Sequence, residues 1–249
     1  MKYDGVTIHS VRDEYGLIEV VQNRSTRKLH FDSPIEQSCL YLNAPMTLNF
    51  EYQEKMVERV LAYVNQYKKN QTVRVLMLGM GGGSMAHHLF HTLPNIQMTV
   101  VELRQAVIDC AYQYFQLPDE PEIEVVCDDA ISFVANNNSQ AYQCEQHENA
   151  HLYDVIMVDI FDAHGLPSEL SDKQFQENLW QNTHSPGLVI FNLWYQWNQT
   201  HSNGKPVATE ETQKVMDFWQ NRVNENAEGL LNRYNVQSSQ NLIAEILKT

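Results

Sequence analysis

The sequence contains few cysteines, and they are widely separated. The four lie at positions 39, 110, 127 and 144, so no two are closer than 17 residues. This spacing excludes the CxxC pairs of redox and zinc sites and gives no framework for disulfides. We therefore expect reduced thiols, the usual state of cysteine in the cytoplasm.

Basic residues and long apolar runs are also scarce. Lys and Arg number 17 against 31 Asp and Glu, so the formal net charge is −14. A surface of this sign repels polyphosphate, so we expect no nucleic-acid partner and favour a cationic one. No stretch approaches the ~20 apolar residues of a spanning helix, and the start, MKYDG, is unlike a signal peptide. The sequence therefore predicts a cytoplasmic protein without membrane association.

Apolar residues are sufficient for a hydrophobic core. They make up 43% of the chain, and 249 residues suit one large domain or one domain with a small appendage. Short alternating runs over residues 1 to about 35 indicate a small antiparallel β unit. Apolar positions at helical spacing predict an amphipathic helix over Glu51–Lys69. We therefore divide the chain into a β-rich N-terminal unit, residues 1–50, and a main domain, residues 51–249.

In the main domain, buried apolar runs alternate with helical segments. The predicted strands are residues 73–78, 98–101, 123–126, 155–158 and 188–191, and the predicted helices are residues 84–93, 104–115, 130–136, 171–181 and 209–226. Strands without polar alternation are covered on both faces, so they predict a parallel sheet of βαβ units. Residues 230–236 and 241–247 predict two last strands, as an antiparallel edge. The fold class is therefore doubly wound α/β.

The first strand of this sheet runs into a glycine-rich loop. The loop reads GMGGGS over Gly79–Ser84, where missing side chains permit a tight turn and let a ligand touch the backbone. Such loops also serve plain strand-to-helix packing, so the loop alone does not decide the function. The dinucleotide fingerprint has glycine in the place that Ser84 occupies.

Acidic residues follow the next three strands. They are Glu102, then Asp128 and Asp129, then Asp159 and Asp162. Glu102 lies about 20 residues beyond the loop, where a carboxylate binds ribose hydroxyls. Since the carboxyl ends of parallel strands meet at one edge of the sheet, four strands deliver glycine or acid to the same rim. We therefore expect a ligand site there.

The charge of this rim indicates the ligand class. The loop carries no lysine or arginine, so a cationic nucleoside fits better than a pyrophosphate, and a nicotinamide cofactor is the weaker alternative. S-adenosylmethionine and decarboxylated S-adenosylmethionine fit, because carboxylates tolerate their positive sulfonium. His87 and His91 share a helix face, but without a third ligand nearby we expect no metal.

Several motifs of the main domain resemble those of one enzyme family. They are VLMLGMGGG over residues 75–83, VVEL over 100–103, Asp129-Ala130, YDVIMVDIFD over 153–162 and SPG over 185–187. Together they resemble spermidine synthases and other polyamine aminopropyltransferases, and most closely the short, poorly characterised members. The resemblance implies a mostly parallel, Rossmann-like sheet of the S-adenosylmethionine-dependent methyltransferase type, which makes residues 51–249 a nucleoside-binding catalytic domain. It also implies a homodimer.

The resemblance further implies a role for each site residue. The donor would be bound by the loop glycines, by Glu102 at the ribose and by Asp129 with the following backbone at the adenine; these donor residues are Gly79, Gly81, Gly83, Glu102, Asp129 and Ala130. Asp159 would take the proton from the attacking amine. Gln37, Tyr52 and Asp162 would bind the cationic amine substrate. An alkylamine with a pKa of about 10 is mostly protonated at neutral pH, so it needs such a base before it attacks carbon.

The chain departs from the family at Gly82. Typical spermidine synthases have an aspartate there, which is expected to pair with the amine of the decarboxylated donor and to repel the carboxylate of S-adenosylmethionine. The loss of such a hydrogen bond costs about 1.5–3 kcal/mol. Two alternatives to aminopropyl transfer from decarboxylated S-adenosylmethionine to an amine such as putrescine therefore stay open. They are an S-adenosylmethionine-dependent methyltransferase and a nucleoside-binding protein without catalysis.

Overall fold

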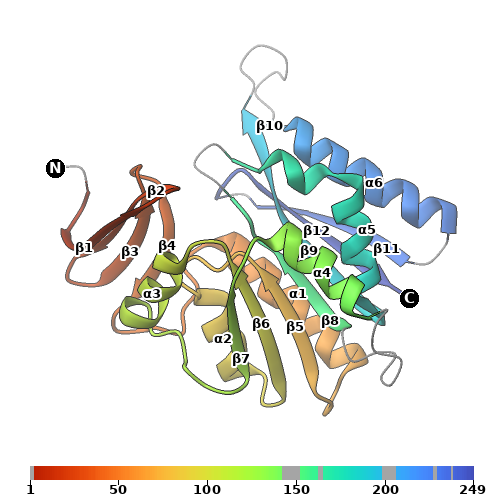
Figure 1. Ribbon diagram of the computed structural model, residues 1–249, viewed down its shortest axis with the longest axis horizontal. Coiled ribbons are helices and arrows are strands. Elements are labelled where there is room, and N and C mark those ends of the chain that lie inside the picture. The colour runs from red at the N-terminus through yellow and green to blue at the C-terminus, as the bar shows by residue number, and fades with distance from the viewer. Residues whose placement is uncertain (1–2, 142–151, 162–164, 198–205, 227–228, 237) are drawn as a thin grey trace.

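The computed structural model describes residues 3–141, 152–161, 165–197, 206–226, 229–236 and 238–249 (Figure 1). The N-terminal unit is an antiparallel sheet in the order β1-β2-β3-β4, formed by β1 (Val6–Asp13), β2 (Gly16–Gln22), β3 (Thr26–Phe31) and β4 (Glu36–Tyr41). The predicted β unit is thus confirmed, but β4 was not foreseen. Its buried residues are consecutive and start with a polar one, Ser38, so they lack the alternation that reveals a strand.

The main sheet has eight strands. Seven follow the order β11-β12-β9-β8-β5-β6-β7, and β10 pairs with β9. The strands are β5 (Val73–Leu78), β6 (Ile96–Glu102), β7 (Ile123–Cys127), β8 (Tyr153–Val158), β9 (Thr183–Trp197), β10 (Pro206–Ala208), β11 (Gly229–Asn235) and β12 (Asn241–Lys248). Strands β5 to β9 pair in parallel, whereas β12 and β11 continue the sheet as an antiparallel edge, as predicted.

Helices cover both faces of this sheet (Figure 1). One face carries α1 (Glu51–Tyr67), α2 (Ser84–Thr92) and α3 (Gln105–Tyr114), and the other carries α4 (Ala130–Ala141), α5 (Lys173–Asn182) and α6 (Glu210–Asn226), with a 3₁₀ turn, η1 (Ser168–Ser171), before α5. The predicted helices are confirmed, although α4 is longer than expected. In β5, Val75 and Met77 pack with the first set of helices and Leu76 and Leu78 with the second, which explains the unbroken apolar run.

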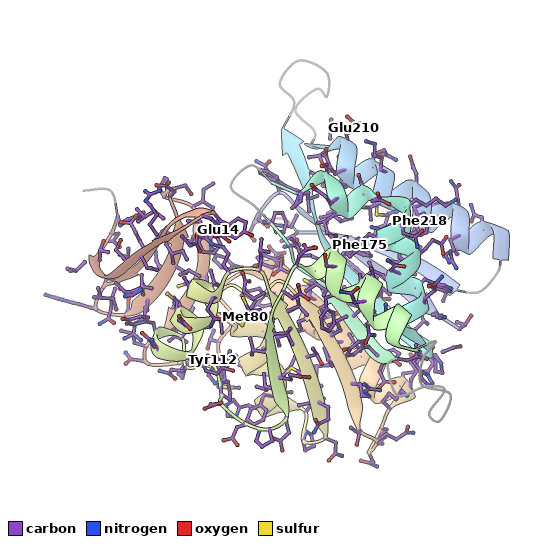
Figure 2. The ribbon with its side chains drawn as sticks, in the orientation of Figure 1. Glu14, Met80, Tyr112, Phe175, Glu210 and Phe218 are labelled. Atoms are coloured by element: carbon purple, nitrogen blue, oxygen red, sulfur yellow. The ribbon has the colours of Figure 1, made fainter. Side chains whose placement is uncertain are left out.

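The N-terminal sheet packs against the first of these cores. Its apolar residues Ile18, Val20 and Leu29 are fully buried in the same cluster as the apolar side chains of α1 to α3. In Figure 2, Met80 of the glycine loop lies between the small sheet and the main sheet. No helix of the described residues is long and apolar enough to cross a membrane.

Candidate active site

The glycine loop is in direct contact with the tip of β8. Gly79 has a positive φ of 87°, and a side-chain carbon there would collide with the backbone oxygen of Asp159. The backbone of Asp159 in turn donates a hydrogen bond from its N–H to the carbonyl of Leu78 at 2.9 Å. Only glycine therefore allows the loop and Asp159 to approach this closely.

Gly82 is closed off by the N-terminal sheet. Its N–H donates to the Ser38 hydroxyl oxygen at 2.7 Å, and the same hydroxyl donates to the carbonyl of Gln37 at 2.8 Å. A Cβ at Gly82 would lie 2.9 Å from the Cβ of Ser38 and 3.0 Å from the Phe115 ring, and both of these residues are 2% exposed. The position at which the resemblance leads us to expect an aspartate is thus filled by packing, and any side chain there requires Ser38 or Phe115 to shift.

Glu102 binds the backbone of the loop. One carboxylate oxygen accepts the N–H of Met80 and the other accepts the N–H of Arg104, both at 3.1 Å. Burial raises the pKa of Glu102 above its ordinary value, although these N–H donors oppose the shift. Carboxylate oxygens have further lone pairs, so the group can still accept hydrogen bonds from a ligand.

Asp129 has a structural role that the sequence analysis did not anticipate. Its carboxylate accepts the N–H of Ser132 at 2.8 Å at the start of α4, whose first residue is Ala130. The preceding residue, Asp128, donates its N–H to the carbonyl of Glu102 at 3.2 Å. The ends of β6 and β7 therefore lie side by side, with Asp129 acting as a helix cap next to them.

Asp159 accepts a hydrogen bond on each of its oxygens. The Asn192 amide donates to Oδ1 at 2.8 Å, and the Tyr52 hydroxyl donates to Oδ2 at 3.4 Å. Burial raises the pKa of Asp159 to about 6, although both hydrogen bonds lower it. Two residues predicted for the site, Asp159 and Tyr52, thus meet despite a separation of 107 residues.

Asn192 is a site residue that the sequence analysis missed. It lies in β9 at 2% exposure, and its Oδ1 accepts a hydrogen bond from the Asn241 amide of β12 at 2.8 Å. The available signal was an amide side chain inside the apolar run LVIFNL, where a buried polar group requires partners.

The structure places Gln37 beside the glycine loop but does not describe Asp162. The carbonyl of Gln37 would lie 3.7 Å from a Cβ at Gly81, and the residue is half-buried. Asp162 falls outside the described residues. The rim also includes Leu103, an apolar side chain that is 43% exposed beside Glu102. Its sequence signal was only its place after the predicted ribose acid.

Comparison with known proteins decides the family. Residues 49–214, about two thirds of the chain, match the spermine/spermidine synthase domain. The chain belongs to this family. A polyamine aminopropyltransferase from Chromobacterium violaceum is 26% identical over 178 residues, which cover 71% of this chain. The chain spans 61% of that relative's length. The family resemblance found in the sequence is therefore confirmed.

Solved structures confirm the fold class. A probable spermidine synthase from Corynebacterium glutamicum has a TM-score of 0.74 at 19% identity, covering 98% of this chain and 80% of its own. Human methyltransferase-like protein 13, solved with SAH, has a TM-score of 0.62 at 20% identity, covering 80% of this chain and 82% of its own. The family member described here has the predicted methyltransferase-type sheet with a small antiparallel sheet before it.

Proposed function

We propose that the protein is a transferase that moves an aminopropyl group from decarboxylated S-adenosylmethionine to an amine such as putrescine. The observation that carries this proposal is the position of Asp159, a carboxylate with a pKa of about 6 in contact with the glycine loop. A base with this pKa is mostly ionised at neutral pH and can accept a proton. Its burial also brings its pKa closer to that of the amine, which favours the transfer.

The donor would lie along the rim from β5 to β7. Gly79, Gly81 and Gly83 would face its chain and ribose, and Glu102 would accept the ribose hydroxyls. Leu103 offers an apolar side chain for the purine, and the backbone at Asp129 and Ala130 would bind the adenine amino group. The carboxylates of the rim suit the positive sulfonium. The proposed transfer requires no metal ion.

The reaction needs one proton acceptor. The amine nitrogen forms a bond to the aminopropyl carbon while the carbon–sulfur bond breaks, and methylthioadenosine leaves as a neutral molecule. The proton of the attacking nitrogen passes to Asp159. Gln37, Tyr52 and Asp162 would orient the cationic amine, which holds the nitrogen in line with the reacting carbon.

A second function, methyl transfer from S-adenosylmethionine, is favoured by one observation. Because Ser38 and Phe115 fill the space at Gly82, no loop acid can repel the carboxylate of the ordinary donor. The two functions therefore differ in which donor the protein prefers.

The test compares the two donors and one variant. Titration calorimetry should give tighter binding of decarboxylated S-adenosylmethionine than of S-adenosylmethionine, and turnover with a panel of amines should release methylthioadenosine. Asp159→Asn should lower turnover by about 10²-fold or more while donor binding stays within a few-fold. Asp109→Asn, an acid on α3 away from the rim, serves as the matched control. Preference for S-adenosylmethionine together with release of its demethylated product would establish methyl transfer, and unchanged turnover in Asp159→Asn would remove the proposed base.

A further inference from the structure

The two hydrogen-bond donors of Asp159 are held in different ways. The Asn192 amide is fixed, because its oxygen accepts from Asn241 and its nitrogen must therefore face Asp159. On the other side, Tyr52 donates a hydroxyl that can turn about its C–O bond. Burial and the nearby carboxylate raise the pKa of Tyr52 well above its ordinary value, so this hydroxyl keeps its proton.

Behind Tyr52 lies a buried glutamine, Gln53, whose side-chain amide has Tyr52 as its one hydrogen-bond partner among the described residues. Gln53 of α1 is 4% exposed, and its Nε2 donates to the Tyr52 hydroxyl oxygen at 3.4 Å. Its Oε1 is buried and has no donor among the described residues. Turning the amide over would offer Oε1 to Tyr52 and leave Nε2 unpaired instead. Each orientation leaves one unpaired polar atom, so only the state of Tyr52 decides between them.

We propose that Gln53 is a positioning residue whose side-chain amide turns over when Asp159 takes up a proton. The proposal rests on the proposed role of Asp159 as the base. In the ionised state, Gln53 donates to Tyr52 and Tyr52 donates to Asp159. In the protonated state, the new O–H on Oδ2 donates to the Tyr52 oxygen, and the Tyr52 hydroxyl donates to Oε1 of Gln53.

The proton balance of this rearrangement is simple. One N–H bond of the substrate breaks and one O–H bond forms on Asp159, while the Tyr52 O–H bond rotates without breaking. Asn192 cannot receive the new proton, because the amide nitrogen that faces Asp159 has no free lone pair. The groups that act on the Asp159 carboxyl from α1 and β9 are Tyr52 and Asn192, and no charged side chain of the described residues is among the causes of its pKa shift. Within the part of the chain that the structure describes, the path through Tyr52 to Gln53 is therefore the one that can reverse its hydrogen bonds.

The sign of one pKa shift tests the proposal. Carbon-13 NMR of protein labelled at the aspartate carboxyl carbons gives the pKa of Asp159, with its resonance assigned by the loss in Asp159→Asn. Gln53→Met keeps the volume and removes both the Nε2 donor of the ionised state and the Oε1 acceptor of the protonated state. Losing the acceptor costs more, because the Tyr52 hydroxyl proton is then buried without a partner, whereas losing the donor leaves Tyr52 its bond to Asp159. We expect the pKa of Asp159 to fall by about one unit. A Gln53 that only donates would stabilise the carboxylate, and its removal would raise this pKa.

Matched variants define the scale of the effect. Gln66→Met is the control, since Gln66 is also on α1 and also donates to an adjacent tyrosine, Tyr67, at 2.9 Å, but has no link to Asp159. It should leave the pKa unchanged. Asn192→Leu removes a fixed donor and should raise the pKa by about one unit. A rise or no change in Gln53→Met would overturn the proposal.

A second measurement needs no variant at position 53. In the wild-type protein, the side-chain amide resonances of Gln53 should shift with the same midpoint as the Asp159 carboxyl carbon, and those of Gln66 should not. A Gln53 amide that does not respond to this titration would also overturn the proposal. Neither measurement depends on turnover. A failed amine assay would therefore remove the proposed function without deciding whether the Gln53 amide turns over. A Gln53 amide that does not respond would in turn leave the proposed function undecided.

Discussion

Two carboxyl groups at the same edge of the sheet, the buried Glu102 and the half-buried Asp159, have different surroundings. Glu102 accepts backbone N–H groups, which have one orientation and keep the group an acceptor. Asp159 accepts from two side chains, and the Tyr52 hydroxyl can reverse its role. This difference suits Glu102 to a static contact with a ligand and Asp159 to a change of protonation state during a reaction.

The raised pKa of Asp159 predicts a pH-dependent stability difference. Its pKa is about 6 in the folded protein and 3.8 in the reference state, so protonation stabilises the fold. This contribution is complete below pH 4 and is lost as the pH rises through 6. The side chain of Asp159→Asn does not ionise, so the variant does not lose this stability as the pH rises. Its unfolding free energy minus that of the wild type should therefore increase by about 2 kcal/mol between pH 4.5 and 7.5.

Urea unfolding at several pH values measures this difference. Asp109→Asn, which changes an exposed acid of α3, controls for the altered net charge. A stability difference between Asp159→Asn and the wild type that stays constant with pH would contradict the raised pKa.

At the scale of elements, β4 packs so closely against the glycine loop that a side chain at Gly82 has no room. Gly82→Asp introduces the aspartate that the resemblance leads us to expect in the loop, but its Cβ would press against Ser38 and Phe115. We expect it to lower the unfolding free energy by about 1–3 kcal/mol, because buried overpacking forces the backbone apart. Denaturant midpoints would measure the loss.

A double variant separates this packing effect from the added charge. Gly82→Ala should already show much of the loss, and Ser38→Gly combined with Gly82→Ala should recover part of it. If Gly82→Asp were as stable as the wild type, the space at Gly82 would be open and the packing argument would be wrong.

The sequence predicted most elements of the main domain for a physical reason. Strands covered on both faces read as apolar runs, and the helices between them show their periodicity. Strand β4 escaped prediction because Ser38 is buried for its hydrogen bond to Gly82, which no local pattern reveals. Strand β9 is longer than its apolar run at both ends, because Thr183 pairs with β8 before the run and residues 195–197 pair with β10 after it.

The candidate site shows the same limit. Asp159 follows an apolar strand, so its place at the rim could be read from the sequence. Its partners could not, because Tyr52 and Asn192 come from other elements and become neighbours only through tertiary packing. The closure of Gly82 by Phe115, the residue after α3, likewise depends on how α3 packs against the N-terminal sheet.

At the scale of the whole molecule, an ion pair joins the two sheets. Arg104, which follows β6, donates from Nε and from Nη2 to the two carboxylate oxygens of Asp13 at 3.0 and 2.8 Å, and to the carbonyl of Gly16 at 3.2 Å. Its guanidinium also lies 4.7 Å from the centre of the Phe31 ring. Burial would raise the pKa of Asp13, but the hydrogen bonds and charge of Arg104 outweigh it and lower that pKa.

This pair predicts how the N-terminal sheet is held. Arg104→Lys cannot form the forked contact and should lower the unfolding free energy by about 1–2 kcal/mol at pH 7. Because the Asp13 pKa is lowered in the folded protein, the difference should shrink as the pH falls below 4. Hydrogen exchange should show faster opening of β1 and β2 in the variant. Arg24→Lys, an exposed arginine in the turn between β2 and β3, should leave both measurements unchanged.

The division at residue 50 and the homodimer remain predictions at this scale. Sedimentation of the purified chain gives its mass in solution and decides the second of them.

The partners of Asp159 also set the order in which the site can assemble as the chain is synthesised. Tyr52 precedes Asp159 by 107 residues, Asn192 follows it by 33, and Asn241 lies 49 residues after Asn192. Among the described residues, Asn241 is the one that orients the Asn192 amide toward Asp159, so this orientation requires that β12 has left the ribosome and paired with β9. The proposed base therefore gains its full set of restraints only after β12 has been made, and a nascent chain that stops before β12 has the carboxylate without the contact that orients Asn192.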